Sequence, residues 1–243
     1  MKWKLLPVLW CVVFASGPFT YAQAPADTAF VVSATSHMVA LHKQALGGQA
    51  RLYNGSRYHE PIITRDYHPF FLSLDWMTGS VWYDGEFFEN VPLLYDLLND
   101  VLVTEHYPSG HPIQLVREKL RDFSIGGHHF EFIENNSVGN SLPRTGFYEV
   151  LYDGETKVVA ARQKFMREIV QSLQVEVEYE EKNRYFVLRN GIFFPVKSKG
   201  SMLKLMDDRR QQLKKLLKQK AISFPDNREL AIKSLAEFYD DLR

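Results

Sequence analysis

The chain of 243 residues carries 29 basic and 29 acidic side chains, and 45% of its residues are hydrophobic. This length suits one large domain or two small ones, and the balanced charge gives no indication of a nucleic-acid partner. It contains neither a glycine-rich phosphate loop before a helix nor a Gly-x-Ser-x-Gly nucleophile motif, so the sequence predicts no cofactor.

The first residues have the pattern of a secretory signal peptide. Lys2 and Lys4 precede an uncharged apolar run over residues 5–14, and small residues follow. A basic start, a short apolar run and a small-residue exit are the layout of such a signal. The run is too short for the ~20 residues that a membrane-spanning helix needs. We therefore expect an exported protein, periplasmic or secreted, without an integral span after processing.

Two cleavage sites compete at the end of this segment. Cleavage after Ala24 would place Pro25 next to the scissile bond, so cleavage after Ala22 is favoured and Gln23 becomes the mature N-terminus. The only cysteine, Cys11, would leave with residues 1–22. We then expect the mature chain to offer no disulfide, thiol nucleophile or thiolate metal ligand.

The next segment has helical periodicity. Apolar residues recur near one helical face over Ala29–Leu46, and Gly47 and Gly48 follow. A glycine pair at that position is a helix stop signal. We predict one N-terminal helix.

Hairpin signals replace helical ones after residue 50. Asn-Gly or Asp-Gly dipeptides lie between extended apolar or aromatic segments at four places, namely 54–55, 84–85, 153–154 and 190–191. Both central residues of a type I′ turn need positive φ, which Asn, Asp and Gly tolerate. We predict two-residue hairpin loops at Asp84–Gly85, Asp153–Gly154 and Asn190–Gly191, and hence a meander of successive antiparallel strands.

The C-terminal segment, about 201–243, is again helical. Leucines and methionines recur at helical spacing from Ser201, and Pro225 precedes a second periodic run. We predict a helical hairpin packed on the sheet. The fold class is α+β, with an N-terminal helix, a curled antiparallel β-meander of about 8–10 strands and this hairpin. Since no Gly-, Ser- or Pro-rich linker interrupts it, residues 23–243 are expected to form a single β-rich domain.

Several short stretches resemble a group of uncharacterised secreted proteins from the Bacteroidetes. The similar stretches are Ala22-Gln23, Leu52–Gly55, Val91–Asp96 and Gly146–Gly154. The resemblance covers most of the mature chain. It implies an exported protein of the bacterial envelope, but it implies no activity and no catalytic residues.

The block from Asp66 to Val116 has the least random composition. It contains no Lys or Arg, eight carboxylates and ten aromatic residues. Aromatic rings beside carboxylates suit a sugar, a cationic peptide or a Ca²⁺ ion, which makes Trp76, Trp82 and Tyr83 the candidate ligand-binding residues. The alternative is structural, because cross-strand ring pairs stabilise a hairpin by packing alone.

Charge of the opposite sign gathers near the C-terminus. Residues 197–220 include nine basic and two acidic side chains. A basic amphipathic helix can bind anionic lipid or dock on the acidic block, but most often it is a solvated face with its leucines turned inward.

Two groups of histidines and carboxylates are candidate metal ligands. On a strand His129 and Glu131 share a face while His128 points away, which supplies two metal ligands rather than three. A second group, His59, Glu60, Asp66 and His68, shares one loop. No metal site is predicted, and no catalytic residue is assigned.

The leading functional hypothesis is an exported, non-enzymatic protein that binds a ligand or partner of the bacterial envelope. The partner would be a glycan, a lipid or an envelope protein. One alternative is a periplasmic hydrolase acting on glycans or lipids, with carboxylates or His129 as the acid and base. Another is an accessory subunit of an envelope assembly.

Overall fold

The computed structural model describes residues 31, 33–34, 37–38, 51–63, 67–106, 109–135, 141–171 and 174–242. The chain divides into two units, residues 1–46 and 47–243, and every element named below belongs to the second. The predicted signal peptide lies outside the described residues. So does most of the predicted helix Ala29–Leu46, which is not among the elements seen.

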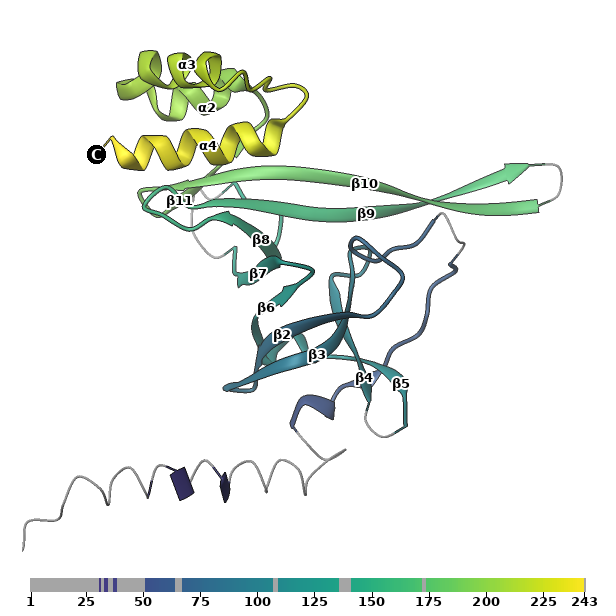
Figure 1. Cartoon of the computed structure of the whole chain (residues 1–243). Coiled ribbons are helices and arrows are strands. Elements are labelled where there is room, and N and C mark those ends of the chain that lie inside the picture. Colours follow the sequence, from purple (N-terminus) through teal and green to yellow (C-terminus); the bar gives the residue numbers. More distant parts are fainter. Residues whose placement is uncertain are drawn as a thin grey trace, which may run out of the picture. The chain divides into compact units, whose positions relative to one another are not determined.

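Eleven antiparallel strands form one sheet (Figure 1). Their bounds are β1 (Ser56–Arg57), β2 (Met77–Tyr83), β3 (Glu86–Asp96), β4 (Val101–His106), β5 (His111–Gln114), β6 (Leu120–Ile125), β7 (His128–Ile133), β8 (Gly146–Tyr152), β9 (Val158–Gln171), β10 (Gln174–Arg189) and β11 (Ile192–Val196). The order across the sheet is β1-β5-β4-β3-β2-β6-β7-β8-β9-β10-β11.

The sheet is not one simple meander, because the chain reverses direction across it at β2. Strands β2 to β5 run outward in sequence order, and the 3-10 turn η3 (Arg117–Lys119) then returns the chain to the free edge of β2. Strand β6 pairs there, and β6 to β11 form a second meander.

Turn chemistry explains two of the three predicted hairpin loops. Asp84 and Gly85 have φ of 52° and 79°, and Asn190 and Gly191 have φ of 52° and 76°, as a type I′ turn requires. These two predictions are confirmed. The loop at Asp153–Gly154 was predicted wrongly, because β8 ends at Tyr152 and β9 begins only at Val158.

A tertiary contact accounts for the longer β8–β9 loop. Asp240 Oδ2 accepts hydrogen bonds from the Thr156 amide at 2.9 Å and from the Tyr152 hydroxyl at 3.1 Å. The loop is therefore shaped around a side chain from the far end of the sequence, which no local turn signal reveals.

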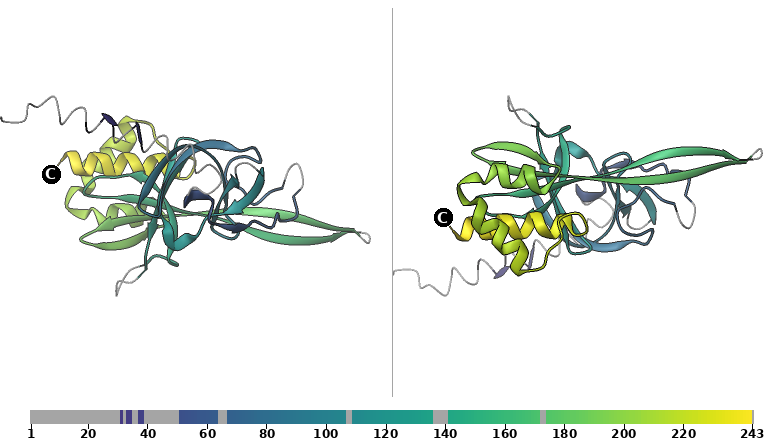
Figure 2. Two further views of the ribbon diagram at one scale, coloured as in Figure 1. Left: turned by 90° about the horizontal axis from the view of Figure 1, so that it is seen from below. Right: turned by 90° about the horizontal axis from the view of Figure 1, so that it is seen from above.

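The first half of the sheet is curled (Figure 2). Its buried side chains form an aromatic core. Tyr95, Phe123 and Phe130 are at most 1% exposed and meet edge-to-face or stacked at centroid distances of 4.9–5.0 Å. Such pairs add to the burial of apolar area that stabilises the fold.

Three helices follow the sheet, α2 (Lys199–Leu205), α3 (Arg210–Gln219) and α4 (Arg228–Asp241). They lie over the β8–β11 end of the sheet (Figure 1), with α4 against β8 and β9 and α2 against β11. Their inward residues, including Leu213, Ile232 and Leu235, form a second core. None of the described helices has the length and apolar character needed to cross a membrane.

The α+β fold-class prediction is wrong. The second unit is mostly a single eleven-stranded antiparallel sheet, and its α-helices are all C-terminal. The expected helical hairpin is three helices, because the 3-10 turn η4 (Asp207–Arg209) divides its first helix into α2 and α3. A capping box between Ser198 and Ser201 marks the start of α2. The short strands β1, at the edge of the sheet, and β5, beside it, raise the strand number above the predicted range.

Candidate functional site

A network of charged side chains, most of them buried, connects β8 and β9 to α4. Arg162 Nε donates to Glu149 Oε2 at 2.6 Å, and its terminal nitrogen donates to Glu229 Oε2 at 2.6 Å. The side chains of Arg162 and Glu149 are 8% and 4% exposed, whereas that of Glu229 is 39% exposed. One guanidinium therefore joins a fully enclosed carboxylate to one that reaches the surface.

Strand register brings the buried pair together. Glu149 of β8 lies opposite Ala160 of β9, so Arg162, two residues further on, shares its face. Burial alone would lower the pKa of Arg162, but the charges and hydrogen bonds of Glu149 and Glu229 raise this pKa above its ordinary value. The guanidinium stays charged in the folded protein.

Two more side chains extend the network at its ends. His128 Nδ1 hydrogen-bonds Glu149 Oε1, and the His128 ring meets Phe71 edge-on at 5.1 Å. At the other end the Tyr185 hydroxyl donates to Glu229 Oε2 at 3.3 Å. Burial raises the pKa of Tyr185 above its ordinary value, although Arg162 opposes the shift. The phenol is therefore a hydrogen-bond donor at neutral pH.

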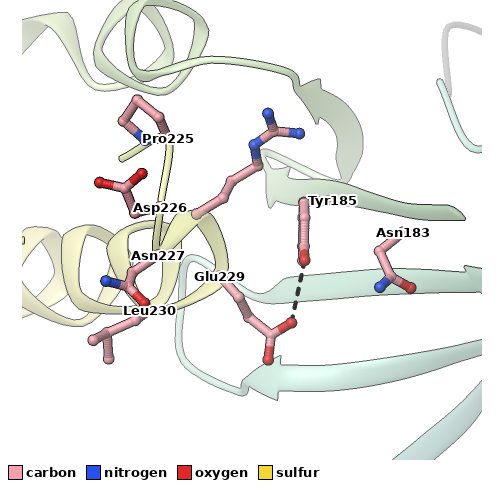
Figure 3. Close-up of a pocket in the computed structure, with 8 residues that line it drawn as sticks. Asn183, Tyr185, Pro225, Asp226, Asn227, Glu229 and Leu230 are labelled. Atoms are coloured by element: carbon pink, nitrogen blue, oxygen red, sulfur yellow. Dashed lines mark hydrogen bonds between the residues drawn. The ribbon is translucent and has the colours of Figure 1, made fainter. Parts of the chain in front are cut away.

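A polar cavity of about 480 Å³ opens at the Glu229 end of this network (Figure 3). Tyr185 and Glu229 face each other there, from β10 and from the first turn of α4. The lining residues are Asn183, Tyr185, Pro225, Asp226, Asn227, Arg228, Glu229 and Leu230. They comprise amides, a phenol, carboxylates and a guanidinium, which together offer both donors and acceptors to a ligand.

Asn183 has an incomplete set of hydrogen bonds at this cavity. Its Nδ2 donates to Glu181 Oε1 at 2.8 Å, but no donor among the described residues reaches its buried Oδ1. Buried acceptors without a donor are uncommon in folded proteins and call for a physical explanation. The hydrogen bond to Glu181 holds this amide in the wall of the cavity.

Sequence reasoning missed Glu149, Arg162 and Glu229. Two of them carried a usable signal, because Glu149 lies inside the apolar segment 147–151 and Arg162 directly follows the apolar segment 158–161. A charge inside such a run must be paired when the strand is buried. The partner Glu229 lies 67 residues from Arg162 in sequence, so only the fold identifies it.

The three residues predicted to bind a ligand do not form one surface. Tyr83 is completely buried in the aromatic core, and its hydroxyl accepts the Val116 amide at 3.3 Å. Trp82 points to the other face of β2, where the Arg121 guanidinium lies 4.0 Å from its ring centre. Trp76 precedes β2 and is 38% exposed. Ligand binding by Trp76, Trp82 and Tyr83 stays a prediction.

Two carboxylates of the acidic block are internal rather than exposed. Asp96 accepts the Tyr58 hydroxyl at 2.8 Å and the Leu98 amide at 2.8 Å. Asp100 accepts the Tyr95 hydroxyl at 2.6 Å and lies 3.2 Å from an Arg117 nitrogen. These contacts hold the turn between β3 and β4, so these two acids act in folding.

The basic segment, residues 197–220, has the solvated face expected of an amphipathic helix. Leu213, Leu216 and Leu217 of α3 are buried, while Lys214 and Lys215 are exposed. The helices contact β8, β9 and β11, which lie outside the acidic block.

The histidines make pairs rather than clusters. His129 Nδ1 lies 3.1 Å from Ser124 Oγ, and its Nε2 lies 3.7 Å from Glu131 Oε1. Within the part of the chain that the structure describes, no three His, Cys, Asp or Glu side chains gather as metal ligands. Asp66, a member of the predicted loop group, lies outside that part.

No protein-family model, no curated protein and no solved structure matches this chain. The resemblance to secreted Bacteroidetes proteins therefore stays a prediction, and functional assignment depends on the site itself.

Proposed function

We propose that the mature chain, residues 23–243, is an exported, non-enzymatic binding protein of the bacterial envelope. Its ligand site is the cavity at the start of α4, and its ligand is a hydroxyl-rich molecule, a glycan in the first instance. The basic, apolar and small-residue order of the first 22 residues supports export.

The observation that carries this proposal is the composition of the cavity. Asn183, Tyr185 and Glu229 line a volume of about 480 Å³, inside the roughly 300–1,000 Å³ range of small-molecule sites, and their side chains include both donors and acceptors. Sugar hydroxyls both donate and accept, so amides and carboxylates are suited to bind them.

The ion pairs argue for binding rather than for acid–base catalysis. Glu149 and Glu229 both accept hydrogen bonds from Arg162. A general acid must donate a proton of its own to the substrate, and a carboxylate engaged as an acceptor by a guanidinium has the opposite role. Arg162 instead holds Glu229 rigidly in the cavity wall, which suits recognition.

A glycan array probed with labelled mature protein tests the proposal, followed by titration calorimetry with the best ligand. Asn183→Ala should weaken binding about tenfold, the equivalent of one hydrogen bond worth about 1.4 kcal/mol. Gln163→Ala is the matched control, because this neighbouring amide on β9 faces the other side of the hairpin. Equal losses in both variants, or no glycan bound by the wild type, would contradict the proposal.

A hydrolase is the second candidate, favoured by the Ser124–His129–Glu131 array. Ser124 also lines a separate cavity of about 330 Å³. Against catalysis, Lys157 Nζ lies 2.7 Å from Glu131 Oε2 and competes for its charge. A fluorophosphonate probe decides between the two, since an activated serine would be labelled and Ser124→Ala would abolish the labelling.

A further inference from the structure

Two further cavities at the helical end of the fold differ in charge from the polar cavity at the start of α4. One, of about 540 Å³, lies between the start of α2 and the α3–α4 connection. A smaller one, of about 90 Å³, lies beside it against β10 and β11. They share Lys197 and Arg228, and neither has a carboxylate in its wall.

Three cations of the larger cavity lack an anionic partner. Lys197, Lys199 and Arg228 are exposed, and none forms an ion pair with any residue in the described part of the chain. Arg189 and Arg210, on nearby elements, lie 3.6 Å and 3.3 Å from aspartate oxygens. The cavity therefore brings together three cations that have no ion pair among the described residues.

The acidic residues nearest in sequence are directed elsewhere. Asp226 and Glu229 line the neighbouring polar cavity, and Glu229 is already bound by Arg162. Like charges around one concave surface repel one another and raise the local concentration of anions. The wall of this cavity is therefore positively charged, which suits a negatively charged ligand.

The remaining wall indicates what kind of anion fits. The hydroxyls of Ser198 and Ser223 border the cavity, and Ile222 and Phe224 supply an apolar floor, with Phe224 buried. Guanidinium, ammonium and hydroxyl groups are typical phosphate ligands. The volume and the apolar floor suit a phosphate carried by a larger molecule rather than a small inorganic ion.

We propose that this cavity binds the phosphate group of an organic phosphate ester, with Lys197, Lys199 and Arg228 as its charged ligands. The site goes beyond the proposed glycan binding and does not depend on it. The polar cavity at the start of α4 shares Arg228 with this site, but Lys197 and Lys199 are absent from its wall. Both a soluble phosphorylated molecule and a phospholipid headgroup carry this chemistry.

Titration calorimetry with glycerol 3-phosphate, with uncharged glycerol as a control, tests the soluble form of the ligand. Co-sedimentation with phosphatidylglycerol vesicles, compared with phosphatidylcholine vesicles, tests the lipid form. The Lys197→Gln/Lys199→Gln variant should weaken binding at least tenfold, because each lost charged hydrogen bond is worth more than one decade of affinity.

The control variant is Lys214→Gln/Lys215→Gln, which removes the same charge from exposed positions on α3 outside the cavity. The proposal expects this variant to bind like the wild type. Binding of glycerol 3-phosphate alone identifies a soluble ligand, and binding of phosphatidylglycerol vesicles alone identifies a membrane headgroup.

Three results would contradict the proposed phosphate site. They are equal losses of affinity in the two double variants, equal binding of glycerol and glycerol 3-phosphate, and no binding to either phosphate source. A wild-type affinity that does not fall with added salt would also count against it, and that measurement needs no variant.

Discussion

Arg162 Nε lies 2.6 Å from Glu149 Oε2 where strands β8 and β9 meet, and both side chains are almost completely enclosed. The desolvation of two charges is costly, and their attraction offsets that cost only when the geometry is good and the remaining hydrogen bonds are made. Here His128 and Glu229 complete the set. The pair ties the aromatic core of the curled sheet to the helical core.

Removing the cation from this network should be strongly destabilising. Arg162→Met leaves Glu149 enclosed without its guanidinium partner, at a cost of about 3–5 kcal/mol in the free energy of unfolding. Urea denaturation followed by circular dichroism measures it. Arg167→Met is the matched control on the same strand, because its ion pair with Glu180 is exposed and worth at most about 1 kcal/mol. Similar losses in both variants would show that the buried network has no special role.

The hairpin between β2 and β3 depends on backbone conformation at Gly85. Its φ is +79°, where a β-branched side chain is strained, so Gly85→Val should cost about 1–3 kcal/mol. Gly200→Ala is the control, since its added methyl would meet only Ser198 Oγ at 3.6 Å and no positive φ is required. Thermal unfolding compares the two, and an unchanged midpoint for Gly85→Val would be the contrary result.

Adjacent aromatic residues on β2 should differ in their effect on stability. Tyr83→Ala empties a fully buried position and should cost about 3–5 kcal/mol. Trp82→Ala removes a partly exposed ring and one cation–π contact with Arg121, worth about 0.5–1 kcal/mol at such a site. Chemical denaturation of both variants checks this. A loss for Trp82→Ala as large as that for Tyr83→Ala would mean that both rings serve the core.

One histidine should make stability depend on pH. Burial, followed by the charge of Lys164, lowers the pKa of His68 below its ordinary value of ~6.5. Below pH ~6.5 the unfolded chain therefore binds a proton at His68 that the folded chain does not bind. The free energy of unfolding is highest above pH ~6.5 and falls as the pH drops toward the folded-state pKa.

The comparison of wild type with His68→Gln isolates this effect. Denaturation midpoints measured from pH 7.5 to about pH 5 should fall less steeply in the variant, because glutamine cannot take up the proton. His111→Gln, at an exposed position, controls for the loss of a histidine in general. Parallel pH profiles for wild type and His68→Gln would contradict the expectation.

Local signals in the sequence predict local structure well here. Asp84–Gly85 and Asn190–Gly191 specify their turns because the required φ values depend on those residues alone. The leucine spacing of α3 likewise reveals its buried face. Features that depend on residues distant in sequence could not be predicted. They include the pairing of β6 with β2 and the β8–β9 loop that is hydrogen-bonded to Asp240.

The candidate site was harder to predict than the fold, because it depends on residues that are distant from one another in sequence. The aromatic and acidic composition of residues 66–116 drew attention to Tyr83, but periodicity does not say which side of a curled sheet is enclosed. The polar cavity combines β10 with α4, and Tyr185 and Glu229 are 44 residues apart. Only the packing of helices on the sheet brings them together.

Hydrogen–deuterium exchange of the mature protein, with and without the tightest glycan from the array, tests the binding site most directly. The account predicts slower exchange on binding in peptides covering residues 183–185 and 225–230, which line the α4 cavity. Unchanged exchange there, with protection appearing instead around Trp76 and Trp82 or around Ser124 and His129, would contradict it.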